Sequence, residues 1–365
     1  MVWKTLWRRK ARTLLTLGGI AIGIAVVVAL LALSDGMVGQ ISGMVTGSGA
    51  DLTLMQAGVA DMSFSALDEQ MGSVIAAMPE VEWVSGLLLN ITPVGEKPYF
   101  LVLGVDPQAA GIRHFRIVEG RPLQEGQEVL LGRMAADFFH KGPGDEFVVQ
   151  GRSYRIAGVY ETGVAYEDTG AVLPMAQAQV LFKKEGQVTL YQAKVRPEAI
   201  DQVDSLRDKI EAQFPEVAVY RSAEFAQNAP DIQTLQTLAG AVSLIGLLAG
   251  ALGTMNTMLM SVHERTREIG TLRAVGWRKW EVLWLIVRES LALGLVGGVL
   301  GVLLGVGLVA LIGLSPALAG AVVGRFSPGT AVAGLLVALL LSALGGLYPA
   351  WRAARLQPVE ALRYE

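Results

Sequence analysis

Residues 263–282 read "HERTREIGTLRAVGWRKWEV", a cluster of charged side chains between two of the most apolar segments of the chain. Hydrophobic residues make up 52% of the 365-residue chain, and aromatic residues only 7%. Few soluble globular domains are this apolar. The composition therefore favours a membrane protein, and the charged cluster then marks a place where the chain leaves the bilayer.

Four runs of the sequence contain no Asp, Glu, Lys or Arg, namely residues 13–34, 232–263, 290–324 and 326–351. Each exceeds the roughly 20 residues that a helix needs to cross a hydrocarbon core of ~30 Å. The second run begins with the polar stretch "IQTLQTL", which predicts a stalk outside the membrane. We therefore expect four transmembrane α-helices, with segment 1–34 forming a cytoplasmic amphipathic start and helix 1, and segment 232–365 forming the stalk and helices 2–4.

Basic residues gather at one set of helix ends, which predicts that both termini and residues 263–282 face the cytoplasm. They are Lys4, Arg8, Arg9, Lys10, Arg12, Arg265, Arg267, Arg273, Arg278, Lys279, Arg288, Arg352, Arg355 and Arg363. Residues 35–231 instead hold 27 acidic against 15 basic residues. The first apolar run is longer than that of a signal peptide, and "LLALSDG" lacks an A-x-A cleavage site, so we expect a retained anchor. The predicted location is a bacterial or archaeal cytoplasmic membrane, with the large domain outside.

The exported domain, residues 35–231, is expected to be α/β with a β-rich insert. A helix is predicted from Ser65, with Ser65 as its cap and an apolar face from Leu67 to Met78, and another after Pro197, with an apolar face from Ile200 to Phe214. Strand candidates flank both helices, which predicts two β-α-β units packed side by side over 35–96 and 184–231. Short strands over 97–183 predict the insert.

Catalytic chemistry finds little support in the residues. The chain has no cysteine, three scattered histidines and no GxxxxGK[ST] phosphate loop. We therefore expect a non-catalytic chain without metal, cofactor or nucleic-acid partner, and if it moves a substrate, the energy must come from a partner.

An amphipathic helix is predicted for residues 263–275, where Ile269, Leu272 and Val275 recur every three residues. Its arginines fit attraction to anionic lipid, but that surface would repel Glu264 and Glu268. Mixed charge suits a protein partner better, because complementary charges set register.

Small-xxx-small glycine spacing predicts close helix packing in the third span, at Gly294, Gly297, Gly298, Gly301 and Gly305. No ionisable residue falls in the middle of a predicted span, unlike in ion-coupled carriers. A hydrophilic conduit through the membrane is therefore not expected.

Two stretches resemble the permease signature of the MacB/FtsX-type ABC transporter family: "NTMLMSVHERTREIGTLRAVGWRKWEVLWLIVRESLALGLVGGVLGVLLG" from Asn256 and "LYPAWRAARLQPVEALRYE" at the end. "WRRKARTLLTLGGIAIGIAVVVAL" looks like the family's first helix. The chain departs from MacB in showing no ATPase domain, and its exported domain is larger than that of FtsX proteins.

The resemblance implies a second permease chain, identical or related, and two ATPase copies docked on the short cytoplasmic helix. On this sequence the docking residues would be Glu264, Arg265, Thr266, Arg267, Glu268, Ile269 and Arg273. Trp3, Trp7, Arg8 and Arg9 would lie at the same surface, either as ATPase contacts or as interface anchors.

Three functions remain open from the sequence. In the first, ATPase dimerisation moves the exported domains and drives export or extraction of a lipid, lipoprotein, peptide or hydrophobic drug. In the second, as in FtsX-like proteins, the exported domain signals to an extracytoplasmic hydrolase or sensor kinase. In the third, the chain is an anchored receptor without an ATPase, and the amphipathic helix only contacts lipid.

Overall fold

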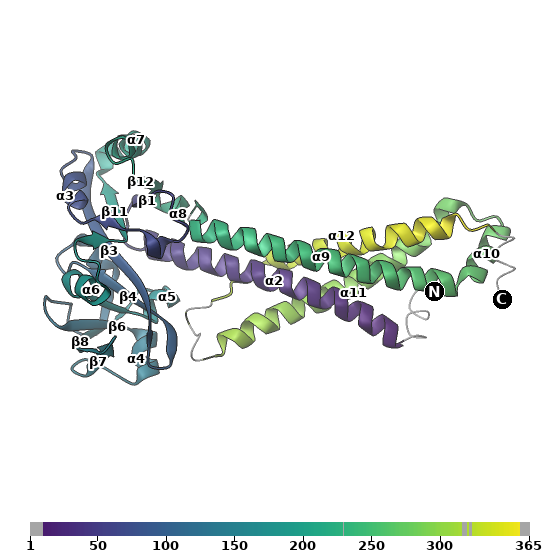
Figure 1. Cartoon of the computed structure of the whole chain (residues 1–365), viewed down its shortest axis with the longest axis horizontal. Coiled ribbons are helices and arrows are strands. Elements are labelled where there is room, and N and C mark those ends of the chain that lie inside the picture. Colours follow the sequence, from purple (N-terminus) through teal and green to yellow (C-terminus); the bar gives the residue numbers. More distant parts are fainter. Residues whose placement is uncertain (1–9, 229, 316–319, 321–322, 358–365) are drawn as a thin grey trace. The chain divides into compact units, whose positions relative to one another are not determined.

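The computed structural model describes residues 10–228, 230–315, 320 and 323–357 (Figure 1). The chain divides into two compact units. We call residues 34–236 with 312–324 the sheet domain, and residues 1–33, 237–311 and 325–365 the membrane unit. Each is considered by itself below.

Long apolar helices build the membrane unit: α2 (Lys10–Thr46), α9 (Pro230–Glu264), α11 (Lys279–Gly313) and α12 (Pro328–Ala354). All four are long and apolar enough to cross a membrane. Local chemistry explains where α12 begins, because the Ser327 hydroxyl accepts a hydrogen bond from the Thr330 amide at 3.1 Å and Pro328 follows in the first turn. The prediction of four membrane helices is therefore confirmed. The short helix α10 (Thr266–Ala274) lies between α9 and α11.

The glycines of α11 lie where neighbouring helices approach most closely. A Cβ added at Gly297 or Gly301 would come within 2.8 Å or 2.6 Å of Ile20 or Ile24 of α2, and one at Gly305 within 2.9 Å of the Ala25 carbonyl oxygen. Contacts this short force neighbouring atoms to move, so these positions need glycine.

A second glycine contact joins α11 to α12. A Cβ at Gly294 would meet the Ser342 hydroxyl at 2.2 Å, and one at Gly298 would meet the Ala338 Cβ at 2.7 Å. Both contact sets lie within one chain. The five glycines therefore place α11 between α2 and α12 in the membrane unit.

The sheet domain contains a ten-stranded sheet in the order β12-β1-β11-β3-β4-β9-β6-β8-β5, with β7 paired to β8. The strands are β1 (Leu52–Gln56), β3 (Val81–Val94), β4 (Lys97–Val105), β5 (Arg116–Gly120), β6 (Glu128–Gly132), β7 (Glu146–Val149), β8 (Arg152–Glu161), β9 (Ala171–Pro174), β11 (Leu190–Val195) and β12 (Val217–Arg221). A separate pair joins β2 (Leu67–Asp68) to β10 (Gln187–Val188). The described helical segments are η2 (Met62–Phe64), α3 (Met71–Ala76), η3 (Ala110–His114), α4 (Arg133–Phe139), α5 (Ala165–Asp168), α6 (Met175–Phe182), η4 (Pro197–Gln202), α7 (Val203–Gln213) and α8 (Ser222–Asn228).

Two apolar cores cover the two faces of this sheet. In β4, Phe100 and Val102 join the core that includes α3, α6 and α7, whereas Leu101 and Leu103 join the core that includes α8 and the end of α2. Side chains alternate between faces along a strand, so a strand buried on both faces is apolar at every position. This explains the continuous apolar run of β4.

The two β-α-β units interleave rather than pack side by side. β1 pairs antiparallel with both β11 and β12 of the second unit, and β11 also pairs with β3 of the first. The two strands of each unit are therefore not neighbours in the sheet, and one strand of the other unit lies between them. The predicted packing is wrong, because each unit alone leaves an unpaired space that only the other unit's strand can fill.

The insert continues the same sheet. β3 has 14 residues and pairs with β11 along its first half and with β4 along its second. β4 is the first strand of the insert, and its parallel pairing with β9 continues the sheet through the insert. The strands of residues 97–183 therefore form no second sheet of their own.

The helix predicted from Ser65 begins later than expected, and the predicted cap at Ser65 is wrong. The Ser65 hydroxyl accepts a hydrogen bond from the Gln56 amide and donates one to the Thr189 carbonyl oxygen, and Leu67 lies in β2. The helix α3 begins only at Met71. These hydrogen bonds keep residues 65–68 extended, although their apolar spacing is typical of a helix.

The helix predicted after Pro197 is shorter than expected. Residues 197–202 form the 3₁₀ segment η4, and α7 begins at Val203. Ile200 is exposed, while Val203, Leu206 and Ile210 are buried. These three form the buried face of α7, and Phe214, just beyond the end of α7, is partly buried against the same core.

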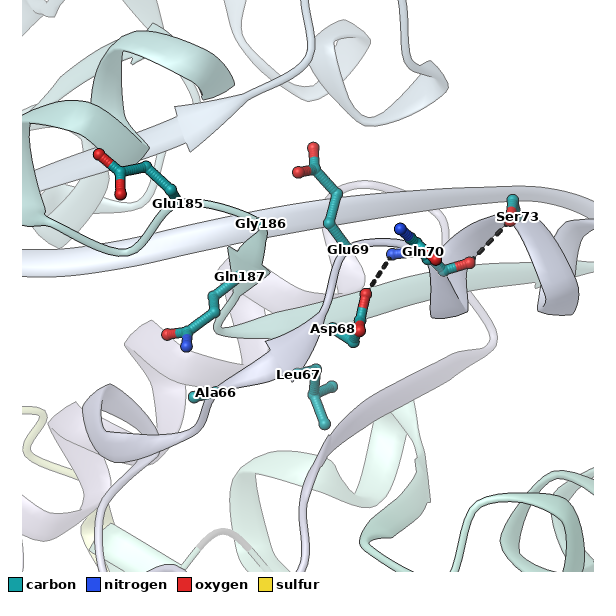
Figure 2. A pocket seen from close by; sticks show the side chains of 9 residues that line it. All are labelled: Ala66, Leu67, Asp68, Glu69, Gln70, Ser73, Glu185, Gly186 and Gln187. Carbon is teal, nitrogen blue, oxygen red and sulfur yellow. Dashed lines mark hydrogen bonds between the residues drawn. The ribbon is translucent and has the colours of Figure 1, made fainter.

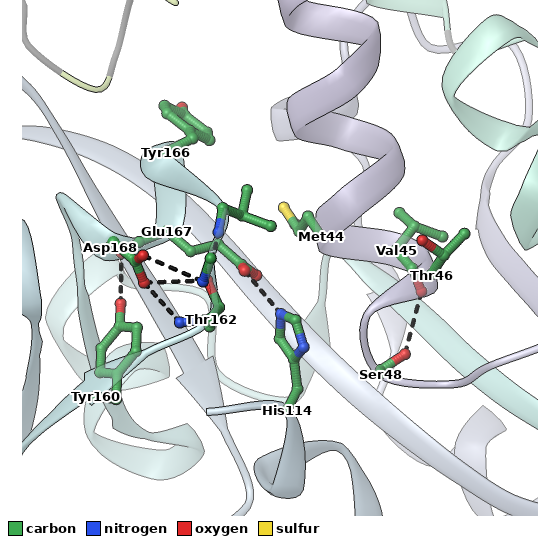
Figure 3. Close-up of polar contacts among 12 residues, drawn as sticks. Met44, Val45, Thr46, Ser48, His114, Tyr160, Thr162, Tyr166, Glu167 and Asp168 are labelled. Atoms are coloured by element: carbon green, nitrogen blue, oxygen red, sulfur yellow. Dashed lines mark hydrogen bonds and ion pairs between the residues drawn. The ribbon is translucent and has the colours of Figure 1, made fainter. Parts of the chain in front are cut away.

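The end of α2 is fixed in the sheet domain by a buried histidine (Figure 3). The His114 Nε2 atom lies 2.7 Å from Glu167 Oε2, and the two side chains are 7% and 1% exposed. A Cβ at Gly47 would come within 2.3 Å of the His114 ring, so the chain just beyond α2 reaches the ring only with glycine there. Burial opposes protonation of His114, but the hydrogen bond and charge of Glu167 outweigh it, and the pKa of His114 is raised.

Candidate functional site

The predicted amphipathic helix of residues 263–275 is α10, with shorter bounds. His263 and Glu264 still belong to α9, and the helical pattern is interrupted at Arg265. The Thr266 hydroxyl donates to the His263 carbonyl oxygen at 2.8 Å across this break. At the other end Gly276 has φ +106°, a left-handed conformation that favours glycine, and lets the chain turn towards α11.

One face of α10 is buried in the membrane unit. Ile269 is 4% exposed and lies in an apolar cluster. The buried members of this cluster are Met258, Val262, Ile269, Val282, Ile286, Leu293, Ala350 and Ala353. Ile269 therefore fixes α10 and offers no surface to a partner, contrary to its predicted docking role.

Arg265 is held by two carboxylates. Its Nε donates to Glu268 Oε2, and its Nη1 donates to Glu289 Oε2 in α11, both at 3.0 Å. The Glu268 side chain is 67% exposed, but that of Glu289 is only 9% exposed. The sequence prediction missed Glu289, whose signal was a lone acidic residue at the edge of an apolar run, in "VRESLAL".

Arg273 closes the turn after α10. Its Nη1 donates to the Trp277 carbonyl oxygen at 2.7 Å, which satisfies a backbone acceptor near the helix end. Thr266 and Arg273 are half-buried. Both therefore serve the local fold of the segment, alongside any contact with a partner.

The remaining predicted residues form what we call the charged face: Glu264, Arg267 and Glu268, all exposed. Arg267 makes no side-chain hydrogen bond or ion pair with any described residue. The structure thus brings opposite charges together on one accessible surface. Trp3, Trp7, Arg8 and Arg9, predicted for the same surface, lie outside the described residues.

Aromatic and basic side chains accompany the charged face on the neighbouring helices. Trp280 and Trp284 pack edge to face at 5.6 Å, and the Arg288 guanidinium lies 5.7 Å from the Trp284 ring. At the end of α12 the Arg355 guanidinium lies 4.0 Å from the Trp351 ring. Such pairs are typical of a membrane–water interface, where the ring is partly in lipid and the cation reaches water.

The sheet domain holds a separate acidic pocket of about 720 Å³ between α3 and the β2–β10 pair (Figure 2). Asp68, Glu69 and Glu185 contribute its carboxylates. Asp68 accepts from the Gln70 amide at 2.7 Å, and Glu69 accepts from Gln179 at 2.9 Å. Within the described residues no group of three His, Cys, Asp or Glu side chains could hold a metal.

Two family models match nearly the whole chain. Residues 13–213 match the MacB-like periplasmic core domain, and residues 240–358 match the FtsX-like permease C-terminal domain. The chain belongs to the MacB/FtsX-type ABC transporter permease family. The sheet domain corresponds to the family's periplasmic-type domain, and the four apolar helices fit an inner-membrane protein.

Curated relatives carry export and permease names. The chain is 29% identical to the macrolide export ATP-binding/permease protein MacB of Bdellovibrio bacteriovorus, over all of this chain and 61% of that protein. It is 29% identical to the pyoverdine export ATP-binding/permease protein PvdT of Pseudomonas savastanoi pv. phaseolicola, over all of this chain and 58% of that protein. It is 27% identical to the uncharacterized ABC transporter permease YvrN of Bacillus subtilis, over 98% of that protein.

The chain thus spans 58–61% of the length of these two export relatives. Among solved structures, the periplasmic region of MacB from Actinobacillus actinomycetemcomitans matches with a TM-score of 0.41 and 15% identity over 50% of this chain and 94% of that one. The extracellular domain of YknZ from Gram-positive bacteria matches with a TM-score of 0.37 and 13% identity over 47% of this chain and 99% of that one. The chain is thus a member of a family of transporter permeases.

Proposed function

We propose that this chain is a non-catalytic permease subunit that converts the closing of a partner ABC ATPase into movement of the sheet domain. The observation that carries the proposal is the charged face, an accessible mixed-charge surface formed by the end of α9 and by α10, whose other side is fixed in the membrane unit. Anionic lipid would repel Glu264 and Glu268, whereas a protein partner can pair with both signs. In this arrangement α10 and both termini face the cytoplasm and the sheet domain lies outside.

The assembly we infer contains two permease chains and two ATPase copies, with ATP and Mg²⁺ bound by the ATPase. The cargo would be a lipid, lipoprotein, peptide or hydrophobic drug, expelled from the outer leaflet or the extracytoplasmic space. Relatives named for macrolide and pyoverdine export support the export of a bulky molecule over the regulatory alternative. The second permease chain is proposed to be identical.

A charge reversal on the charged face tests the docking step. The chain is reconstituted in nanodiscs with its cognate ABC ATPase, and complex formation and ATP turnover are compared for wild type and Arg267→Glu. We expect Arg267→Glu to release the ATPase, because the substitution turns an attraction across a protein interface into a repulsion. Arg113→Glu is the matched control, because Arg113 is an exposed arginine of the sheet domain.

Two results bear against the proposal. If Arg267→Glu binds the ATPase and turns over ATP like wild type, the charged face is not the docking site. If Arg113→Glu weakens the complex equally, the effect reflects overall charge and not a contact.

A further inference from the structure

Glu289 is an acidic side chain buried within a helix that is apolar enough to span a membrane. It is 9% exposed, and from Lys279 it lies about 15 Å along the axis of α11 at ~1.5 Å per residue. A partner protein cannot contact a side chain so buried. Charged groups are expensive inside apolar helix bundles, and those that occur there are paired and usually functional.

Its partner Arg265 stands at the interruption between α9 and α10. The guanidinium fork binds Glu268 of α10 on one side and Glu289 of α11 on the other. This one side chain therefore joins α10 to α11 at the residue that lies between the end of α9 and the start of α10.

Stability alone does not explain this pair. Removing two charges from water costs most of what their attraction returns, and apolar residues of similar size often hold such a site as well. Ile269 and its apolar neighbours already attach α10 to α11. The ion pair additionally fixes one register between α10 and α11, so that a displacement of α10 is passed to α11.

The helix α11, which contains Glu289, packs against α2 within the membrane unit. Gly297, Gly301 and Gly305 of α11 pack directly on α2, with no room for a side chain. α2 itself continues without interruption to Thr46, among the residues of the sheet domain. A displacement of α11 would therefore be passed to α2 by backbone contact, because close-packed interfaces do not deform smoothly.

We propose that the Arg265–Glu289 ion pair, which we call the clasp, transmits movement of α10 to α11. The movement then reaches the sheet domain through α11 and α2 as well as along α9. Arg265 and Glu289 are positioning residues, not ATPase contacts. The inference rests on the proposed function for the source of the push, but the clasp itself is measurable without an ATPase.

The first experiment measures the clasp alone. A nitroxide label is placed at Thr271→Cys, an exposed position of α10 in a chain that has no cysteine. In nanodiscs we expect Glu289→Gln to raise the label's mobility. Glu268→Gln is the control, because Glu268 shares the same arginine but is exposed, and exposed pairs contribute little. Unchanged mobility in Glu289→Gln overturns the clasp.

The second experiment measures transmission. Hydrogen–deuterium exchange of residues 34–236 is recorded with and without ATP in the complex with the ATPase. We expect Glu289→Gln to bind the ATPase within about twofold of wild type, because the site is buried, yet to lose most of the ATP-dependent exchange difference. A variant that damaged only folding would lose binding as well. An exchange response equal to wild type overturns the proposed route.

The two proposals fail in different ways. If wild type binds no ATPase, the proposed function is wrong, while the mobility of the label still decides the clasp. Should Glu289→Gln fold poorly because Arg265 is left unpaired, the double variant Arg265→Gln/Glu289→Gln removes both charges and should recover expression. It should remain as uncoupled as the single variant, and a double variant with a normal exchange response would refute the inference.

Discussion

Replacing Gly301 by alanine tests how closely α11 and α2 pack. The added Cβ would lie 2.6 Å from the Ile24 Cβ and 2.8 Å from the Ala21 carbonyl oxygen. Neither atom is the free end of a flexible side chain, so the helices themselves must separate. Overpacking of this kind typically costs about 1–3 kcal/mol.

A second glycine of the same helix supplies the control. A Cβ at Gly307 would meet nothing within 4 Å. Both substitutions gain the preference of a helix for alanine, about 0.5–1 kcal/mol, so this term cancels between them. The two variants should therefore differ by about 1–3 kcal/mol in unfolding free energy, or roughly 5- to 150-fold in the unfolding equilibrium constant.

Reversible unfolding of the purified chain in bicelles measures this difference. We expect Gly307→Ala to match or exceed wild type and Gly301→Ala to unfold more readily. If the two variants shift equally, α11 does not approach α2 as closely as described, and the packing argument for all three glycines of this contact is refuted.

Two further outcomes concern the sheet domain. Because the pKa of His114 is raised above 6.5 in the folded state, its ion pair with Glu167 stabilises the fold fully below about pH 6.5, and this contribution disappears as the pH rises through the folded pKa. Thermal unfolding measured against pH should show this dependence, and His114→Gln should flatten it. In chemical denaturation, Ile75→Ala should lower the free energy of unfolding by about 2–5 kcal/mol, because Ile75 is fully buried in the core of the sheet domain. Val74→Ala, at an exposed neighbour, should change it by less than about 0.5 kcal/mol, and equal losses would contradict the burial of Ile75 and the exposure of Val74.

The membrane helices could be predicted because their signal is local. A run without charged residues, such as 290–313, carries enough information by itself to indicate a span. The glycines of α11 were likewise visible as a spacing. Their partners were not, since nothing in the sequence assigns Gly301 to Ile24 rather than to a second copy of the chain.

Features that depend on contacts between distant residues could not be predicted from the sequence. The predicted helix does not begin at Ser65 because the Ser65 hydroxyl binds Thr189, 124 residues away. The break at Arg265 has neither Gly nor Pro to mark it, and Glu289 meets Arg265 across 24 residues and a turn. Seven residues of the predicted docking segment looked equivalent in the sequence, and only packing separated Ile269 and Arg265 from the charged face.

The interleaved strand order also constrains how the chain is made. β1 follows closely after the first membrane helix, but both strands that flank it belong to the far end of the sheet domain, and Thr53 finds its hydroxyl partner Ser222 only 169 residues later. Pairing across so long a separation is slow and leaves strand edges open to wrong partners. During synthesis, β1 therefore stays unpaired until almost the whole domain has been made, and this is the interval in which the nascent chain most needs protection from aggregation.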